Sequence, residues 1–415
     1  MTGSKKAEGG RRAHKRRLLL SAFYFSVVGL SLLGSSKPGS SNAHEPITTK
    51  VRFNKEVVRI LDRNCNGCHN PASIAPSLMT YEDARPWAKA IKEELLERRM
   101  PPWHAVKGYG EFSNRPSLTQ HEIDVIVSWV EGGAPRGEDK DLPPREAVLP
   151  DWPLGKPDLV LQPADAVTVK ADHDDYRFVS LPGSFKEDRW LSAIDLKPGD
   201  GRVVHCATIF AEKETRQSRS VIATWMPGQK RVALPEGVAR QLAAGSRLSV
   251  KIHYRGIGEE VKDSSSVGLY FARTTPAKQT REIDVTNPDV VIPPGASLHR
   301  VTASYNIQED TEAIALRPRA HPLVVSLQAT AYRPDGSQEV LIWTRGYRFD
   351  WQPTYYLKRT APLAKGTRVE VVAYFDNSEE NAYNPNSPPK QVRWGDLTSD
   401  PLFTLVVTAA RASTD

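Results

Sequence analysis

The periodicity of apolar residues changes along the chain and sets narrow limits on its fold. Beyond Pro163, apolar and polar residues alternate with a period of two in short segments rich in β-branched and aromatic residues. Pro334-Asp335-Gly336 predicts a hairpin turn between two of them. The segments are RFVSL, RVVHCATIF, RLSVKIHY, SVGLYFA, PLVVSLQATAY, EVLIWT and TRVEVVAYF. Many short strands with little helix predict antiparallel β-sandwiches.

Before this β region the periodicity is helical. In residues 51–133, an apolar stripe precedes two cysteines, and two further stripes follow them. Thr80 and Thr119 each begin a capping-box sequence, and Gly132-Gly133 predicts the end of the last helix. Three helices in this stretch predict one small all-α domain.

These patterns divide the chain into separate parts. Repeated prolines in residues 135–165 predict an irregular linker, and a break near residues 274–287 divides the β region, which is large for one sandwich. The predicted fold class is multidomain: a small all-α domain followed by two tandem antiparallel β-sandwiches. The predicted boundaries are 1–43 for a leader, 44–134 for the α domain, 135–165 for the linker, 166–280 for the first sandwich and 281–415 for the second.

The positive charge of the chain is concentrated at its N-terminus. Residues 1–43 carry eight Lys or Arg residues and one acid, which accounts for the whole formal net charge of +7. The remaining body is neutral, which argues against a nucleic-acid partner. The basic residues precede an apolar run at residues 18–34 and small residues ending at Ala43, which is the order of an export signal. An uncleaved membrane anchor is the alternative, and in both cases an exported, periplasmic or otherwise extracytoplasmic body is predicted.

Two of the three cysteines lie in NCNGCHNPASIAP, residues 64–76. Cys65, Cys68 and His69 match the ligand types of a zinc site, a redox dithiol or covalent haem c attachment. Zinc needs further ligands, and the third cysteine, Cys206, lies far away in the β region. A redox dithiol is typical of a thioredoxin-like βαβ unit, whereas these surroundings are helical. Haem c bound through both thiols, with His69 as axial ligand, is the favoured interpretation, and export agrees with it.

A second axial ligand of the haem iron is predicted at Met100. A thioether ligand raises the reduction potential of a six-coordinate haem. Met100 lies in RRMPPWHA, where Pro101-Pro102 force an extended turn that can bring the sulfur over the haem plane. Met79 lies in a capping turn and is expected to pack, and His104 is a minor alternative ligand that is expected to be exposed.

Histidines and Cys206 are the metal ligands that the β region offers. The segment RVVHCATIF carries His205 and Cys206, and RLSVKIHY carries His253 on the polar face of its strand. Neighbouring residues of a regular strand point to opposite faces, so His205 and Cys206 can share a metal only through a β-bulge or a strand end. A buried free thiol is the alternative for Cys206.

Most of the chain after residue 51 resembles the copper type II, ascorbate-dependent monooxygenases, which include the peptidylglycine α-hydroxylating and dopamine β-monooxygenase enzymes. The resemblance is carried by the His205 strand, LPEGVARQLAAGSRLSVKIHY, RGYRFDWQPTYYL and DNSEENAYNPNSPPKQVRWGDLTSD. The chain is more similar to bacterial relatives in which a cytochrome c segment ending in MPPWHA precedes that module. The resemblance implies two jelly-roll-like sandwiches that face each other across a cleft and can each hold one copper.

The resemblance implies a first, electron-relay copper at His205, Cys206 and His253. The family uses a His-His pair on one strand and a His-Tyr on another, and this chain has His205-Cys206 and His253-Tyr254 at those places. Two imidazoles are thus retained, and a thiolate stands in for the third. Cysteine is a competent soft ligand, especially for Cu(I).

The second, oxygen-activating copper site is implied to be a remnant. Of its three ligand positions only His321 is retained, and Arg319 is a cation that opposes metal binding. The methionine position of the family falls at about Leu402. One ligand of three does not hold copper for oxygen chemistry, so a degenerate site is expected.

Taken together, the sequence predicts an exported c-type cytochrome that transfers single electrons and is fused to a copper monooxygenase-like β module. The predicted cofactor is haem c, and the β module is either a degenerate copper site or a docking domain without metal. The predicted partner is a redox protein or a small reductant, with membrane attachment through residues 1–43 as an option. Two alternatives stay open. One is an active copper monooxygenase that hydroxylates C–H bonds with electrons from its own haem. The other is a β module that binds carbohydrate or protein and positions the haem.

Overall fold

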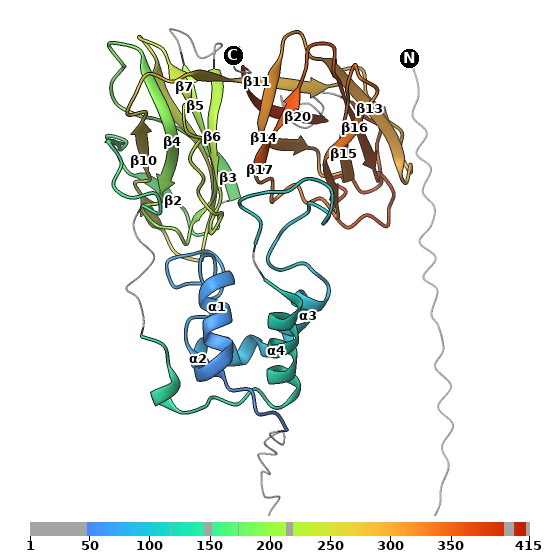
Figure 1. The fold of residues 1–415 in the computed structure, drawn as a ribbon. Helices are drawn as coiled ribbons and strands as arrows, with labels where there is room; N and C mark the ends of the chain where they lie inside the picture. The colour runs from blue at the N-terminus through green and yellow to red at the C-terminus, as the bar shows by residue number, and fades with distance from the viewer. Residues whose placement is uncertain are drawn as a thin grey trace, which may run out of the picture. The chain divides into compact units, whose positions relative to one another are not determined.

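The computed structural model shows a chain that is mostly β-structure (Figure 1). Strand residues make up 41% and helical residues 13%. In the part of the chain that is described, no helix is both long and apolar enough to cross a membrane. The predicted leader, residues 1–43, lies outside that part. The described residues are 48–116, 118–144, 152–172, 174–212, 219–393 and 402–411.

Short helices lie near the cysteine pair and share a small core around the fully buried Trp129. Both predicted capping boxes are present, because the Thr80 side chain accepts a hydrogen bond from Asp83 N and the Thr119 side chain accepts one from Glu122 N. The elements are η1 (Phe53–Val57), α1 (Val58–Asn64), α2 (Tyr81–Ala84), η2 (Arg85–Trp87), α3 (Ala88–Leu96), α4 (Gln120–Glu131) and η3 (Asp139–Asp141).

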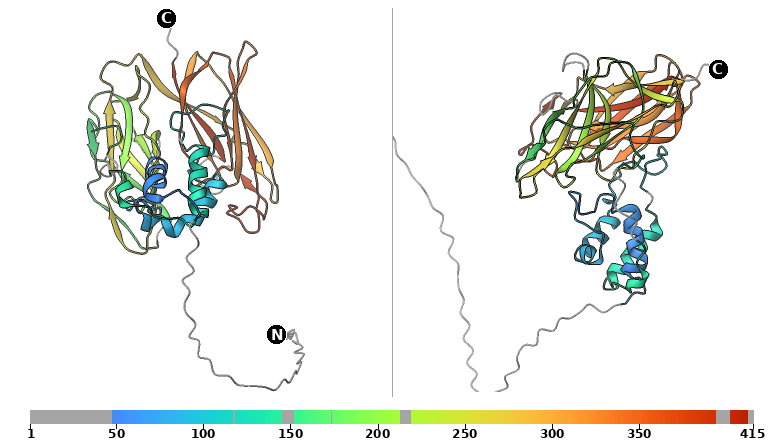
Figure 2. Two further views of the ribbon diagram at one scale, coloured as in Figure 1. Left: turned by 60° about the horizontal axis from the view of Figure 1, so that its bottom comes forward. Right: turned by 90° about the vertical axis from the view of Figure 1, so that its left-hand side faces the viewer.

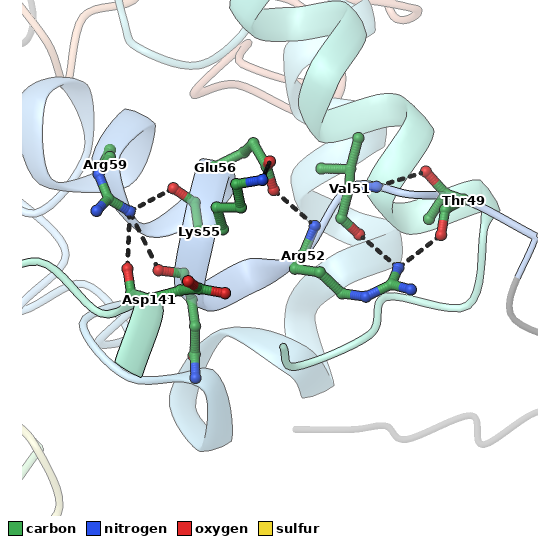
Figure 3. A network of polar contacts seen from close by, with 8 residues as sticks. Thr49, Val51, Arg52, Lys55, Glu56, Arg59 and Asp141 are labelled. Atoms are coloured by element: carbon green, nitrogen blue, oxygen red, sulfur yellow. Dashed lines mark hydrogen bonds and ion pairs between the residues drawn. The ribbon is translucent and has the colours of Figure 1, made fainter. Parts of the chain in front are cut away.

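Two arginines fix the start of this helical segment (Figure 3). The Arg52 guanidinium donates to the carbonyls of Thr49 and Val51, at 2.5 and 3.2 Å. Arg59 donates to the carbonyl of Asp141 at 3.1 Å, which joins α1 to η3. These bonds satisfy backbone carbonyls outside regular structure and anchor the helix that leads into the cysteine pair.

One eight-stranded sheet extends through the whole β region. Its order is β1-β10-β4-β7-β11-β20-β14-β17. Strand β7 pairs in parallel with β11, with Val238 opposite Lys278, and β11 occupies the predicted break at residues 274–287 and pairs on its other side with β20. The strands are β1 (Leu159–Leu161), β10 (Ser266–Phe271), β4 (Arg189–Lys197), β7 (Val238–Leu242), β11 (Lys278–Thr286), β20 (Phe403–Arg411), β14 (Thr311–Ala320) and β17 (Tyr355–Leu363).

Two four-stranded antiparallel sheets and two short strand pairs complete the β region. Figure 2 shows the β region from two further directions. Strands β1–β10 contribute to one hydrophobic core and strands β11–β20 to a second, larger one, and we refer to them as the first and second halves. The first sheet contains β3 (Asp174–Ser180), β8 (Arg247–Arg255), β5 (Val204–Glu212) and β6 (Arg219–Trp225) in that order. The second contains β13 (His299–Asn306), β18 (Arg368–Phe375), β15 (Val324–Tyr332) and β16 (Gln338–Arg345). The short pairs are β2 (Val167–Val169) with β9 (Val261–Asp263), and β12 (Val291–Ile292) with β19 (Val392–Arg393).

The predicted fold class, a small all-α domain followed by two tandem sandwiches, is wrong. The helices are short and form no separate domain, because residues 45–415 make one compact unit. After two prolines end the helical pattern, an extended segment enters the second half, where Ala105 pairs with Thr344 and Phe112 with Leu357. Ala105 and Phe112 are buried in the second core, and this burial of apolar surface stabilises the attachment. The shared eight-stranded sheet likewise replaces two independent sandwiches.

Candidate functional site

The CxxCH sequence forms a tight turn directly after α1. Cys65 N donates to Leu61 O at 2.8 Å, and the amides of Cys68 and His69 both donate to Cys65 O, at 3.0 and 2.9 Å. The backbone therefore holds the two thiols and the imidazole in one hydrogen-bonded turn.

His69 has the environment of a metal ligand. Its Nδ1 lies 2.9 Å from the carbonyl oxygen of Pro76, to which a protonated Nδ1 donates. Metal-binding histidines commonly donate one ring N–H to a backbone carbonyl, which fixes the tautomer and leaves the other nitrogen for the metal. The Nε2 atom of His69 is thus the one available to a haem iron.

Cys65 and Cys68 are free thiols with little tendency to ionise. Burial raises the pKa of Cys65 to about 12 and the pKa of Cys68 to about 11. A redox dithiol needs a lowered pKa, so that alternative does not fit these thiols. Within the described residues they belong to no group of three or more potential metal ligands, which also argues against zinc. Two protonated thiols beside an oriented imidazole fit covalent haem attachment.

Met100 and His104 lie on either side of the two prolines that follow α3. The Met100 side chain is 37% exposed, and its role as second axial ligand stays a prediction. His104 is buried, contrary to expectation, and its ring lies 5.2 Å from the ring of Tyr347. Burial, assisted by the charge of Arg348, lowers the pKa of His104 to about 4. His104 is therefore a neutral packing residue of the second half.

The structure brings His205, Cys206 and His253 together. Their ligand atoms all lie within 4.8 Å of one another, and no other described residues form such a group. Cys206 pairs with His253 across β5 and β8, and the register of this pairing shifts between Val204 and Cys206. His205 is the extra residue of this β-bulge. The bulge that the sequence required for a shared site is therefore present.

The geometry of this cluster fits a soft metal ion. The Nδ1 atoms of His205 and His253 lie 3.2 Å apart, a separation typical of two donors on one ion, roughly 3–4 Å for metal–ligand bonds of about 2.0–2.3 Å. Burial lowers the pKa of His205 to about 4, so its imidazole is neutral and can donate a lone pair. Burial raises the pKa of the Cys206 thiol to about 11, and metal binding would release its proton. Two imidazoles and one thiolate suit copper, whereas hard cations prefer oxygen ligands.

Two residues of β3 hold His253 from outside the cluster, and sequence reasoning missed both. The Asp174 carboxylate lies 2.5 Å from His253 Nε2, and the Tyr176 ring stacks on the imidazole with centroids 4.4 Å apart. The alternation of β3 places Asp174 and Tyr176 on one face. The missing information was the pairing of β3 with β8, which sets Tyr176 opposite His253.

The CxxCH turn contacts the residues that follow β6, the strand beside β5. Cys68 Sγ donates to the carbonyl of Pro227 at 3.2 Å, and a Cβ atom added to Gly228 would lie 2.0 Å from that sulfur. These residues follow β6, whose Trp225 pairs with Ala207, the residue after Cys206. The two candidate redox sites are thus connected through the end of β6.

His321 lies apart from the cluster, in the second half. It is buried, its amide donates to Leu402 O at 2.9 Å, and its Nδ1 accepts a hydrogen bond from Leu323 N at 3.2 Å. Leu402 is itself buried, so the residue beside His321 is an apolar side chain in the place where the resemblance implies a methionine ligand. Arg319 pairs with Thr404 across β14 and β20.

Comparisons with known proteins do not identify a family. No protein-family model matches the sequence, and no curated protein matches it. Similar solved structures include the major capsid protein P2 of bacteriophage PM2, with 10% identity over 62% of this chain and 98% of that chain and a TM-score of 0.28. PNGF-II has 8% identity over 61% and 65% of the two chains and a TM-score of 0.26. The structure of the infectious bursal disease virus Gx strain has 12% identity over 65% and 78%, with a TM-score of 0.18.

Proposed function

We propose that this chain is an exported electron-transfer protein that binds haem c at its CxxCH turn and copper at His205, Cys206 and His253. The observation that carries the proposal is the contact between Cys68 of the CxxCH turn and Pro227, which follows β6, the neighbour of the cluster strand β5. When bound, both groups supply one-electron couples, Fe(III)/Fe(II) and Cu(II)/Cu(I). A redox protein or a small reductant is the proposed partner.

The residues of the CxxCH turn have separate tasks in this proposal. Cys65 and Cys68 provide the thiols for covalent attachment, and His69 presents Nε2 because Nδ1 is held by Pro76. Met100 is the proposed second axial ligand. Burial of both thiols keeps them protonated, which limits their oxidation before attachment.

The residues of the cluster favour electron transfer over oxygen chemistry. His205, Cys206 and His253 form one site, and His321 stands apart with Leu402 as its neighbour. A coupled pair of oxygen-activating and relay coppers needs ligands in both places, whereas a relay needs the first alone. The retained cluster therefore supports a copper relay without a hydroxylation site.

Two glycine contacts support direct coupling of the sites. A Cβ atom on Gly228 would meet Cys68 Sγ, and one on Gly201 would lie 2.2 Å from the carbonyl of Ala72. Gly201 shortly precedes β5, which carries His205 and Cys206, and Gly228 follows β6 beside it. The absence of a side chain at both positions lets the CxxCH turn and the residues after it closely approach the segments that precede β5 and follow β6.

Rapid reduction of the full chain tests this proposal. A substoichiometric one-electron reductant is mixed with protein loaded with haem and copper, and the haem absorbance and the Cu(II) electron paramagnetic resonance signal are followed. We expect a phase in which electrons redistribute between haem and copper, and the rate of this phase should be independent of protein concentration. The phase should vanish in the double variant His205→Ala, His253→Ala and persist in His321→Ala, which serves as the matched control.

Two results would contradict the proposal. A redistribution rate that rises with protein concentration would place the electron transfer between molecules. A wild-type chain that carries no covalent haem would remove the donor altogether.

A further inference from the structure

The His253 imidazole makes polar contacts through both of its ring nitrogens. Its Nδ1 faces His205 Nδ1 at 3.2 Å, and its Nε2 faces the Asp174 carboxylate at 2.5 Å. The Tyr176 ring lies almost parallel to the imidazole, at an angle of 13°. A flip of the ring about the Cβ–Cγ bond would break the Asp174 contact, and a smaller rotation would also disturb the stacking on Tyr176.

The Asp174 carboxylate determines which ring nitrogen carries the proton. An ionised carboxylate accepts hydrogen bonds and cannot donate them, so the N–H of a neutral His253 lies on Nε2. Nδ1 then carries the lone pair, and this is the nitrogen that faces the cluster.

Asp174 is itself fixed by its neighbours. Its second oxygen lies 3.4 Å from Arg255 Nε, and the two residues are register partners across β3 and β8. The next residue, Asp175, pairs instead with Arg177 at 2.9 Å. The two adjacent aspartates therefore have different partners, and Asp175 offers a matched control.

We propose that Asp174 is a positioning residue of the copper site, which accepts a hydrogen bond from the Nε2–H of His253 and leaves Nδ1 as the metal-binding atom. Tyr176 confines the ring in that orientation. The inference rests on the proposed copper site, and it also predicts the tautomer of His253 in the copper-free chain. A carboxylate that accepts from a ligating histidine also makes that ligand more basic, which favours Cu(II) over Cu(I).

The tautomer is tested first, in the copper-free full chain labelled with ¹⁵N-histidine. Nuclear magnetic resonance distinguishes protonated from unprotonated ring nitrogens, and the His253→Gln variant assigns the signal. We expect the Nε2–H tautomer in the wild type and in Asp175→Ala, and a loss of that preference in Asp174→Ala. A wild-type His253 with its proton on Nδ1 would overturn the inference, even in a chain that binds copper.

Copper binding is tested next, with Cu(I) as the probe. Asp174→Ala should weaken Cu(I) binding by about 10- to 100-fold and raise the Cu(II)/Cu(I) potential. Asp174→Asn, which keeps an acceptor oxygen without the charge, should have a smaller effect and serves if the alanine variant does not fold. Asp175→Ala should leave affinity and potential unchanged.

The outcomes separate the inference from the proposed function. Unchanged Cu(I) affinity and potential in both Asp174 variants would overturn the positioning role and leave the copper site standing. A wild-type chain that binds no copper would overturn the copper site itself, whatever the tautomer of His253.

Discussion

The two halves of the β region each carry a histidine at a position where copper is implied, but their surroundings differ. In the first half a β-bulge lets the side chains of the consecutive residues His205 and Cys206 lie in one group, and His253 on the neighbouring strand completes it. In the second half His321 has Leu402 and the backbone of Leu323 as neighbours. A single histidine in a strand is thus compatible with packing, whereas donors supplied by two strands can form a metal site. A metal site needs several donor side chains close together, and a single histidine does not provide them.

The halves also differ in how the helical segment contacts them. The CxxCH turn touches the first half through Cys68 and Pro227, next to the cluster. The extended segment after α3 touches the second half through Ala105 and Phe112, inside its apolar core. The helical segment thus has a polar contact with the first half and an apolar contact inside the core of the second half.

The largest difference between the halves should appear when histidines are removed. The double variant His205→Ala, His253→Ala should bind no copper, because it retains one ligand of three. The variant His321→Ala should bind as much copper as the wild type. Copper per chain, measured by mass spectrometry on dialysed protein, checks this, and equal losses in both variants would mean that the halves do not differ as described.

Adding ligands to the second half should increase the copper bound per chain, and this effect should be smaller than the loss predicted above. The double variant Arg319→His, Leu402→Met supplies an imidazole and a thioether near His321 and removes a cation. We expect a second, weaker copper site, detected by calorimetric titration with Cu(I). The control is Arg319→Gln, Leu402→Ile, which removes the cation without adding donors and should bind one copper per chain.

The contact with the first half should be sensitive to Gly228. It has a positive φ of 63°, and Cβ would also lie 2.0 Å from Cys68 Sγ. Gly295 has a similar φ of 72° and open space around it. Gly295→Ala should therefore cost only the strain of a left-handed residue, about 1–2 kcal/mol of unfolding free energy. Gly228→Ala should cost more and slow the redistribution of electrons, as measured by denaturant unfolding and rapid reduction; equal costs would argue that the CxxCH turn does not dock there.

The burial of His104 against the second half predicts a dependence of stability on pH. Its pKa is about 4 in the folded chain and about 6.5 when unfolded, so the unfolded state binds the proton more strongly between these values. The unfolding free energy should fall as the pH drops from about 6.5 to 4, by up to about 1.4 kcal/mol per pH unit for this group. His104→Gln should reduce this slope equally with and without copper, as followed by urea unfolding. A slope unchanged by the substitution would show that His104 is not buried as a neutral imidazole.

The capping of the helices and the need for a β-bulge at the cluster could both be predicted from the sequence. Both capping boxes at Thr80 and Thr119 are present, since capping depends on residues three apart. The need for a bulge at His205-Cys206 followed from the alternation of side chains in a strand, and the bulge is there. The parallel pairing of β7 with β11 was not predictable, because it depends on contacts between residues distant in the chain. Asp174 was not predicted for the same reason, because it contacts His253 only through the pairing of β3 with β8.

The measurement that decides most is the amount of haem and copper per chain in one sample of the purified protein. A pyridine haemochrome assay under denaturing conditions counts covalent haem, and mass spectrometry counts iron and copper. One covalent haem and one copper per chain are expected, with the copper lost in His205→Ala, His253→Ala. Two coppers per chain, or copper that survives that double substitution, would contradict the difference between the two halves, and a chain without covalent haem would contradict the assignment of the CxxCH turn.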